Sequence, residues 1–373
     1  MGGGIFMKKV IVVGAGVGGL GVAGLLAQKG YEVMVLEKNE MVGGRGRVWK
    51  RDGFRFDMGP SWYLMPDVFE HYFSLFGKKP SDFYSLKRLN PHYRVFFDQG
   101  RVVDVPAEYE ELKKLFDTFE ERGSEKLDRF VKESSRRYQI AMRDFVYRKY
   151  DGVKSVLDWR LIGEGMRLNV FASLGSYVSS VFSSDEARKI VQYPIVFLGG
   201  DPRITPAIYS ILSQIYFNLG VWYPEGGLGR VFDALKKLGE GLGVDVRCGE
   251  EVLGISEDRN GLRVKTINGD YLAESVVMNG DYHHLEADLL LKDSVAYDER
   301  YWEKRTVAPS AFIAYLGLNK RIEGLEHHTL VFAHDWERHF REIFINPSWT
   351  KKPSYYVCCP SKTDLSVVPG DYF

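Results

Sequence analysis

Three glycines near the start of the chain have the spacing of a phosphate-binding turn. Gly14, Gly16 and Gly19 stand in the sequence GAGVGG, with Gly18 beside the last of them. The first glycine permits a tight turn, the second lets the backbone approach a pyrophosphate, and the third lets a helix pack closely on a strand. Free N–H groups and the dipole at the helix N-terminus attract negative charge. A glycine turn without a ligand is the alternative, and the flanking sequence decides between the two.

The flanking sequence favours a dinucleotide site. Residues 8–13 (KKVIVV) predict a strand buried on both faces, 20–29 predict a helix, and 31–37 (YEVMVLE) predict a second strand. This order implies a parallel sheet. Glu37 ends the second strand, where its carboxylate can accept hydrogen bonds from ribose hydroxyls and would repel a 2′-phosphate. We include the next residue, Lys38, in the predicted site.

A second pair of glycines is followed at once by an arginine. Gly43, Gly44 and Arg45 come soon after Glu37. The guanidinium of Arg45 offers bidentate pairing to a phosphate, and a surface salt bridge is its alternative role. The pattern VxGxGxGGL, then an acid, then GGR resembles the FAD-binding amine-oxidase and phytoene-desaturase superfamily. The resemblance implies that FAD is the cofactor and that GGR lies along its phosphates and flavin.

Later segments extend this resemblance over nearly the whole chain. The sequence FDMGPS, which ends in Gly59, Pro60 and Ser61, resembles the family segment near the flavin, and its Asp57 either satisfies loop amides or has another role that is not catalytic. The loop YPEGGLG at 223–229 resembles one of carotenoid desaturases. The resemblance places further cofactor contacts at Val252, whose backbone would meet the adenine, and at Asn279. The C-terminal segment 353–370 also resembles the desaturases.

The leading interpretation is an FAD-dependent oxidoreductase that desaturates a phytoene-like C40 carotenoid by hydride transfer to flavin. One alternative is a carotenoid isomerase without net redox change. Another is an FAD-free isoprenoid-binding escort protein, against which Glu37 and the GGR sequence argue. No motif secures a proton-transferring side chain, so no catalytic residue is assigned. Six aromatic residues are either ordinary core or the wall of an apolar tunnel for the polyene: Tyr193, Phe197, Tyr209, Tyr216, Phe217 and Trp222.

The predicted fold class is α/β, with a Rossmann-like FAD-binding domain and an inserted mixed α+β substrate domain. We expect the FAD-binding domain at 1–70 and 219–290 and the substrate domain at 71–218 and 291–373. Several elements are predicted from local patterns: helical segments within 109–150, a helix from Ser184 to Val191 with a capping box from Ser183 to Glu186, a helix at 230–242, strands at 244–247, 261–266 and 270–278, and a hairpin turn at Asn268-Gly269.

Composition excludes other classes of partner. The chain has 50 basic and 50 acidic residues, which gives no basic face for a nucleic acid. Three cysteines without CxxC spacing predict a cytoplasmic protein without disulfides. The pairs His283-His284 and His327-His328 predict no metal site, because adjacent residues do not face one ion and no third His or carboxylate is suitably spaced. A polyene substrate lives in lipid, so we expect peripheral membrane contact.

The resemblance also raises an expectation about the C-terminus. The family continues beyond the segment at 353–370 to a glycine-rich motif that completes the flavin pocket, and this chain ends at Phe373 without it. The expectation is therefore that the chain is a fragment, or the defective product of a truncated gene, and that it retains FAD weakly or not at all.

Overall fold

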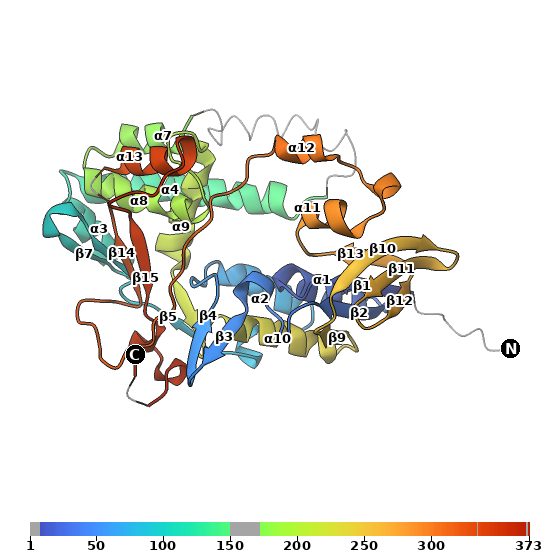
Figure 1. Cartoon of the computed structure of the whole chain (residues 1–373). Helices are drawn as coiled ribbons and strands as arrows, with labels where there is room; N and C mark the ends of the chain where they lie inside the picture. The colour runs from blue at the N-terminus through green and yellow to red at the C-terminus, as the bar shows by residue number, and fades with distance from the viewer. Residues whose placement is uncertain (1–7, 150–171, 334, 371) are drawn as a thin grey trace.

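Two lobes lie side by side in the computed structural model, which describes residues 8–149, 172–333, 335–370 and 372–373 (Figure 1). One lobe contains the N-terminal strands and most of residues 222–290, and the other contains the helices between residues 109 and 219. Tyr150, the last residue of the predicted helical pattern, falls outside the described residues. No helix among the described residues is both long and apolar enough to cross a membrane.

A four-stranded parallel sheet is the centre of the first lobe. Its strand order is β13 (Ser275–Met278), β1 (Lys9–Val13), β2 (Glu32–Glu37) and β9 (Asp245–Cys248). Branched side chains fill β1 and β2, and both faces of these strands are buried, as the apolar runs predict. The Rossmann-like α/β fold class is therefore confirmed.

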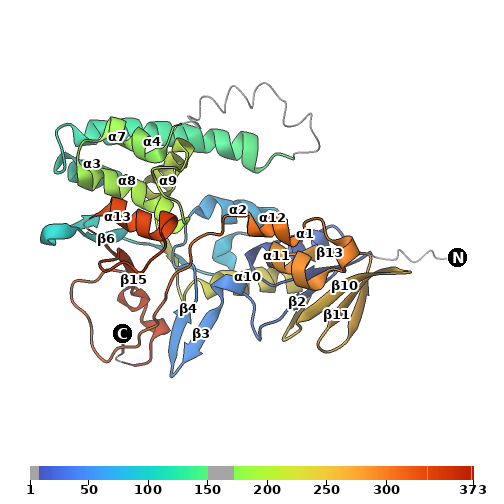
Figure 2. The ribbon, with the colours of Figure 1, turned by 45° about the horizontal axis from the view of Figure 1, so that its top comes forward.

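Each face of this sheet is covered by a different layer. On one face, α1 (Val17–Gln28) and α10 (Gly229–Glu240) bury Leu20 and Leu235 against Val12 and Val33. The other face packs on an antiparallel sheet of β10 (Val252–Asp258), β11 (Gly261–Thr266) and β12 (Asp270–Ala273). Figure 2 shows these strands at the edge of the lobe farthest from the helical lobe.

The predicted single strand at 270–278 is wrong in one respect, because it is two strands in different sheets. β12 pairs with β11, whereas β13 pairs with β1. The chain changes partner at Glu274, whose N–H donates to the carbonyl oxygen of Lys9 at 3.0 Å. The hairpin turn at Asn268-Gly269 is confirmed, since it joins the antiparallel strands β11 and β12.

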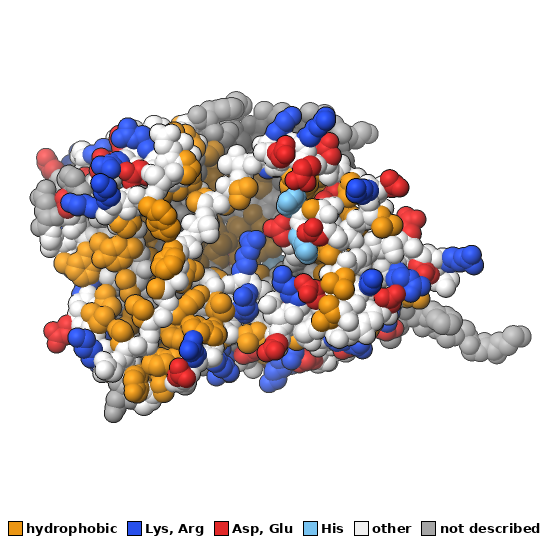
Figure 3. Space-filling model, in the orientation of Figure 1, with side chains coloured by type: hydrophobic (Ala, Val, Ile, Leu, Met, Phe, Trp, Pro, Cys, Tyr) orange, Lys and Arg blue, Asp and Glu red, His pale blue; other side chains and the backbone are white. Residues whose placement is uncertain are grey.

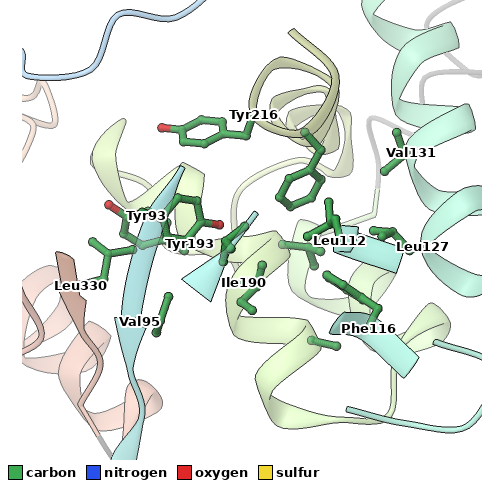
Figure 4. Packing of buried hydrophobic residues seen from close by; sticks show 14 of the residues in the cluster. Tyr93, Val95, Leu112, Phe116, Leu127, Val131, Ile190, Tyr193, Tyr216 and Leu330 are labelled. Carbon is green, nitrogen blue, oxygen red and sulfur yellow. The ribbon is translucent and has the colours of Figure 1, made fainter. Parts of the chain in front are cut away.

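The second lobe combines a mixed sheet with a group of helices. Its strand order is β15 (Tyr355–Cys358), β14 (His328–Val331), β6 (Tyr93–Phe96) and β7 (Val102–Val105), with β14 and β6 parallel. Figure 4 shows side chains from these strands and from the helices meeting in one apolar core, among them Val95, Phe116 and Leu330. The helices of this lobe are α3 (Tyr109–Asp117), α4 (Gly123–Ile140), α7 (Leu174–Val181), α8 (Asp185–Phe197) and α9 (Ile211–Gln214).

Helix α8 begins differently from the prediction. Its N-cap is Ser184, whose side chain accepts a hydrogen bond from the N–H of Ala187. Ser183 takes no part in a capping box, because its backbone N–H and hydroxyl both bind the carboxylate of Glu120. The predicted capping box is therefore wrong: the N-cap is one residue later, its N3 residue is Ala187, and Ser183 contacts Glu120 instead.

Short elements connect the two lobes. β3 (Val48–Arg51) and β4 (Phe54–Asp57) form a hairpin, and β5 (Leu86–Arg88) pairs with β8 (Trp222–Pro224). β5 leads into β6 of the second lobe, and β8 leads into α10 of the first lobe. The pairing of β5 with β8 therefore connects the two lobes. The remaining helices are α2 (Pro66–Ser74), α11 (Tyr282–His284), α12 (Glu299–Glu303) and α13 (Trp336–Phe340).

Candidate functional site

The glycine turn lies between β1 and α1 at the carboxyl edge of the parallel sheet. Gly14 has φ of +100°, a backbone conformation that favours glycine. A Cβ at Gly19 would stand 1.9 Å from the carbonyl oxygen of Gly14, so the helix can approach the strand only without a side chain there. No side chain caps the N-terminus of α1, and its first turn has no acidic residue. Its free N–H groups therefore suit an anionic ligand.

Glu37 is buried at the end of β2, beside this turn. Its carboxylate accepts hydrogen bonds from the N–H of Ala15 at 2.8 Å and the N–H of Asn39 at 2.9 Å. The N–H of Glu250 donates to the Glu37 carbonyl oxygen at 2.8 Å, which brings the start of β10 to the same place. Glu37 thus holds the glycine turn through the N–H of Ala15, and its carboxylate still has lone pairs for a ligand.

Two other predicted residues lie close to Glu37 along the chain. Lys38 is exposed. The side chain of Val252 is buried in the core between the two sheets, so only its backbone could reach a ligand.

The GGR segment lies directly against the glycine turn. The N–H of Gly43 donates to the carbonyl oxygen of Ala15 at 2.9 Å, and a Cβ at Gly44 would stand 3.3 Å from the Cα of Gly16. The side chain of Arg45 is 94% exposed, with one charged group, the carboxylate of Asp281, at 3.6 Å. The guanidinium therefore lies near the turn and makes no contribution to the packing of the core.

Asn279 and Asp281 complete the edge of this site from the end of β13. The N–H of Asn279 donates to the carbonyl oxygen of Val13, and its side chain lies so close to the turn that a Cβ at Gly18 would clash with its Oδ1. Asp281 caps α11 by accepting the N–H of His283 at 3.0 Å. Sequence reasoning chose Asn279 but missed Asp281, although both stand in the same NGD sequence.

The FDMGPS segment runs from the GGR segment toward the second lobe. A Cβ at Gly59 would stand 2.2 Å from the carbonyl oxygen of Arg45, so the two segments are in backbone contact. Pro60 lies beside Gly46. The hydroxyl of Ser61 is 2.8 Å from that of Tyr356 in β15, which joins the predicted cofactor segment to the other lobe.

Asp57 has a structural role at the start of α10. Its carboxylate accepts the N–H groups of Leu228 at 2.7 Å and Gly229 at 3.1 Å. Burial raises the pKa of Asp57, and these two hydrogen bonds oppose that effect only in part. Of the two roles left open for Asp57, the structure supports the satisfaction of loop amides.

The two segments that resembled carotenoid desaturases most closely bind each other. Asp364 accepts hydrogen bonds from the N–H of Gly226 at 2.6 Å and the hydroxyl of Tyr223 at 3.2 Å. Gly226 and Gly227 have φ of +87° and +92°. The C-terminal segment therefore holds the glycine-rich loop that precedes α10.

Five of the six aromatic residues proposed as a tunnel wall have described side chains, and these five do not line one cavity. A cavity of about 130 Å³ in the second lobe is lined by Tyr193 together with Leu330, Phe332, Trp336 and Tyr356, among others. Tyr216 and Phe217 belong to the buried core, Tyr209 is exposed, and Trp222 packs against the core beneath the glycine turn. The side chain of Phe197 lies outside what the structure describes. Of the five whose side chains the structure describes, Tyr193 lines this cavity and the other four do not.

The pair His327-His328 is not alone. Cys358 on the adjacent strand brings a thiol to both imidazoles, so that one ligand atom from each of the three residues lies within 4.8 Å of the others. The prediction of no metal site rested on the lack of a suitably spaced third His or carboxylate, and Cys358 supplies a third candidate ligand of another kind. The pairing of β14 with β15 brings it there, and nothing in the local sequence reveals that pairing.

Comparison with known proteins agrees with this geometry. A family model described as flavin containing amine oxidoreductase matches residues 17–340. A carotenoid 3,4-desaturase from Haloarcula japonica is 46% identical over 367 residues, which are 98% of this chain and 74% of the relative. A zeta-carotene-forming phytoene desaturase from Myxococcus xanthus is 31% identical over 364 residues, which are 97% of this chain and 70% of the relative.

A solved structure supports the fold alone. A protein from Pyrococcus furiosus superposes with a TM-score of 0.58 at 18% identity, over 98% of this chain and 77% of the other. The family match and the two relatives confirm the resemblance found in the sequence. The chain belongs to the flavin-containing amine oxidoreductase family, within its carotenoid desaturase group.

Proposed function

We propose that the chain desaturates a carotenoid with FAD as the hydride acceptor. The observation that carries the proposal is the uncapped N-terminus of α1 above a glycine turn, with Arg45 and Asn279 beside it. It is joined to a sequence 46% identical to a carotenoid 3,4-desaturase. The family supports a flavin, and the following residues are proposed to hold it as FAD: Gly14, Gly16, Gly18, Gly19, Glu37, Lys38, Gly43, Gly44, Arg45, Gly59, Pro60, Ser61, Val252 and Asn279.

The described residues fit the ADP part of FAD. No side chain caps the N-terminus of α1, so its N–H groups are free to bind a pyrophosphate, and the side chain of Arg45 extends into solvent beside it. Glu37 ends β2, and we propose that its carboxylate accepts hydrogen bonds from the ribose hydroxyls. Ser61 continues the site toward the second lobe, where the reacting part of the cofactor would meet the substrate.

Desaturation removes a hydride and a proton from adjacent carbons, and the oxidised flavin of FAD accepts the hydride. The chain itself must then bury an apolar polyene and orient one C–H bond. The cavity beside Tyr193 and Trp336 is apolar, but at about 130 Å³ it is smaller than most ligand sites. We therefore propose that the cavity binds only part of the polyene. Burial of apolar surface would provide the binding energy.

An apolar face beside this cavity supports peripheral membrane contact. Tyr355 lines the cavity and is also half exposed, and Ile345 and Trp349 nearby in the chain expose most of their side chains. Figure 3 shows hydrophobic side chains gathered over this lobe, while charged side chains are denser on the other. A polyene dissolved in lipid could enter the cavity from this face.

The test is anaerobic incubation of the FAD-loaded chain with a carotenoid precursor in liposomes. We expect loss of flavin absorbance and a product two hydrogens lighter with a longer polyene. A product of unchanged mass but new geometry would support the isomerase instead. A chain that binds the isoprenoid but never flavin would support the escort protein. An FAD-loaded chain that leaves both flavin and substrate unchanged would contradict the desaturase proposal.

A further inference from the structure

Two buried imidazoles and one partly buried thiol lie together where the two lobes meet. It consists of His327, His328 and Cys358, whose ligand atoms lie within 4.8 Å of one another. His328 stands directly opposite Cys358 in the antiparallel pair of β14 and β15, so their side chains share one face of the sheet. The N–H of Cys359 donates to the carbonyl oxygen of His327 at 2.8 Å, which keeps His327 beside them. Backbone pairing therefore fixes all three residues.

Each imidazole is held through one nitrogen by a hydroxyl. The Nδ1 of His327 is 2.7 Å from Oγ1 of Thr363, and the Nδ1 of His328 is 2.7 Å from the hydroxyl of Tyr356. In the tautomer in which each Nδ1 donates to its hydroxyl, both Nε2 atoms have a free lone pair. Ligating histidines in metal proteins are typically oriented in this way by an oxygen acceptor on the other ring nitrogen.

The two Nε2 atoms have no partner among the described residues, although both side chains are buried. His327 is 4% exposed and His328 is 0% exposed, and each Nε2 is inaccessible to solvent. A buried polar atom without a hydrogen bond costs about 1–3 kcal/mol, so two such atoms on neighbouring histidines need a reason. A bound cation would satisfy both at once.

Two carboxylates lie close to this group. Asp364 lies near His327 and Asp57 near Cys358, close enough to act electrostatically on them. These two carboxylates would balance the surplus positive charge of a divalent ion bound to one thiolate.

We propose that His327, His328 and Cys358 bind Zn²⁺ through two imidazole nitrogens and one thiolate. Nitrogen and sulfur ligands favour Zn²⁺ over Mg²⁺ or Ca²⁺, which prefer oxygen. The ligand atoms would have to close by about 1 Å to reach the distances of a tetrahedral zinc site. Three protein ligands leave a fourth position open. The ion would brace β14 against β15 beside Tyr356, which connects the group to Ser61.

The experiment measures zinc in the full chain without any carotenoid, so its result does not depend on the proposed desaturation. We expect one Zn²⁺ per chain by metal analysis after zinc loading under reducing conditions. X-ray absorption at the zinc edge should give one sulfur at about 2.3 Å and two nitrogens at about 2.0–2.1 Å. Absence of zinc binding, or a shell of oxygens only, overturns the proposal. Binding of Cu⁺ but not Zn²⁺ overturns the assignment of the ion.

Variants separate this site from surface binding. Cys358→Ser and His328→Gln should each lower zinc affinity at least about tenfold. Cys359→Ser is the matched control, because it removes the neighbouring thiol, which is not part of the group, and should leave the affinity unchanged. Equal affinity in Cys358→Ser and the parent chain overturns the proposal. The absorption spectrum of the unmodified chain needs no variant and decides the question if Cys358→Ser fails to fold.

Discussion

Position 19 can hold only glycine, because one carbonyl oxygen occupies the place of a side chain. A Cβ there would stand 1.9 Å from the oxygen of Gly14, and since that atom is backbone it cannot move without opening the turn. We expect Gly19→Ala to lower the free energy of unfolding by about 1–3 kcal/mol and FAD affinity by at least about tenfold. Urea unfolding and a flavin fluorescence titration measure the two effects.

The control lies one half-turn further along the same helix. A Cβ at Gly21 would have its nearest neighbour, the ring of Tyr72, at 3.7 Å, which is ordinary contact. Gly21→Ala should therefore keep FAD affinity and gain up to about 1 kcal/mol from helix propensity. Equal FAD affinity in Gly19→Ala and the parent chain would show that the turn does not hold the pyrophosphate.

Arg45 separates two roles, a surface salt bridge and a phosphate ligand. Its side chain is 94% exposed and has Asp281 at 3.6 Å, an arrangement that adds little stability. Arg45→Ala should leave the free energy of unfolding within about 0.5 kcal/mol and still lower FAD affinity by about tenfold. Unfolding and flavin titration of the same variant decide between the roles.

Arg51 provides the comparison for that variant. It is also exposed and pairs with the adjacent Asp52 in the hairpin of β3 and β4. Arg51→Ala should change neither quantity. If Arg45→Ala and Arg51→Ala bind FAD equally well, the guanidinium of Arg45 does not contact the cofactor.

Among the elements, Glu120 joins the start of α8 to the start of α4. Its carboxylate accepts the N–H of Ser183 at 2.9 Å and the ammonium of Lys126 at 2.7 Å. Burial raises the pKa of Glu120, but the hydrogen bonds from Lys126 and Ser183 outweigh burial and leave the pKa below its ordinary value of 4.5. The ionised form is therefore favoured in the folded chain.

We expect Glu120→Gln to lower the free energy of unfolding by about 1–3 kcal/mol near pH 7. Because the folded pKa is depressed, the advantage of the parent chain is present above pH 4.5 and is lost as the pH falls through the folded pKa. Urea unfolding across pH 3.5–7 measures this difference. Glu121→Gln, at the exposed next residue, should show no such change, and a pH-independent loss in Glu120→Gln would contradict the explanation.

Elements were predictable from the sequence where their pattern is local. The glycine turn, its flanking strands and α10 follow from apolar runs and glycines, and all lie within a few residues of their predicted bounds. The change of sheet at Glu274 was not predictable, because β12 and β13 read as one continuous strand. Ser183 lost its capping role to Glu120, a residue distant in sequence.

The site residues likewise divide into those that the sequence predicts and those that it does not. The residues around Gly14, Gly44 and Asn279 could be chosen because motifs mark them, and the structure brings their backbones together. Cys358 could not, because its approach to His328 depends on strand pairing. The proposed domain boundaries at 70, 218 and 290 stay a prediction, as do the individual FAD contacts and the weak FAD retention.

At the scale of the whole molecule, the two lobes present different surfaces to their surroundings. Trp349, 89% exposed, belongs to the lobe that contains the apolar cavity, whereas Leu253, 46% exposed, lies on β10 at the far edge of the other lobe. If the cavity lobe faces the membrane, Trp349→Ser should weaken liposome binding several-fold by removing an exposed aromatic anchor. Leu253→Ser should not weaken it, because the surface of Leu253 faces away from the bilayer.

Sedimentation with liposomes of neutral lipid measures the binding of both variants. Since neither side chain supports the core, the unfolding curves of both variants should coincide with that of the parent chain. Equal weakening in both variants, or in neither, would contradict the membrane-facing orientation and leave the polyene another route into the cavity beside Tyr193.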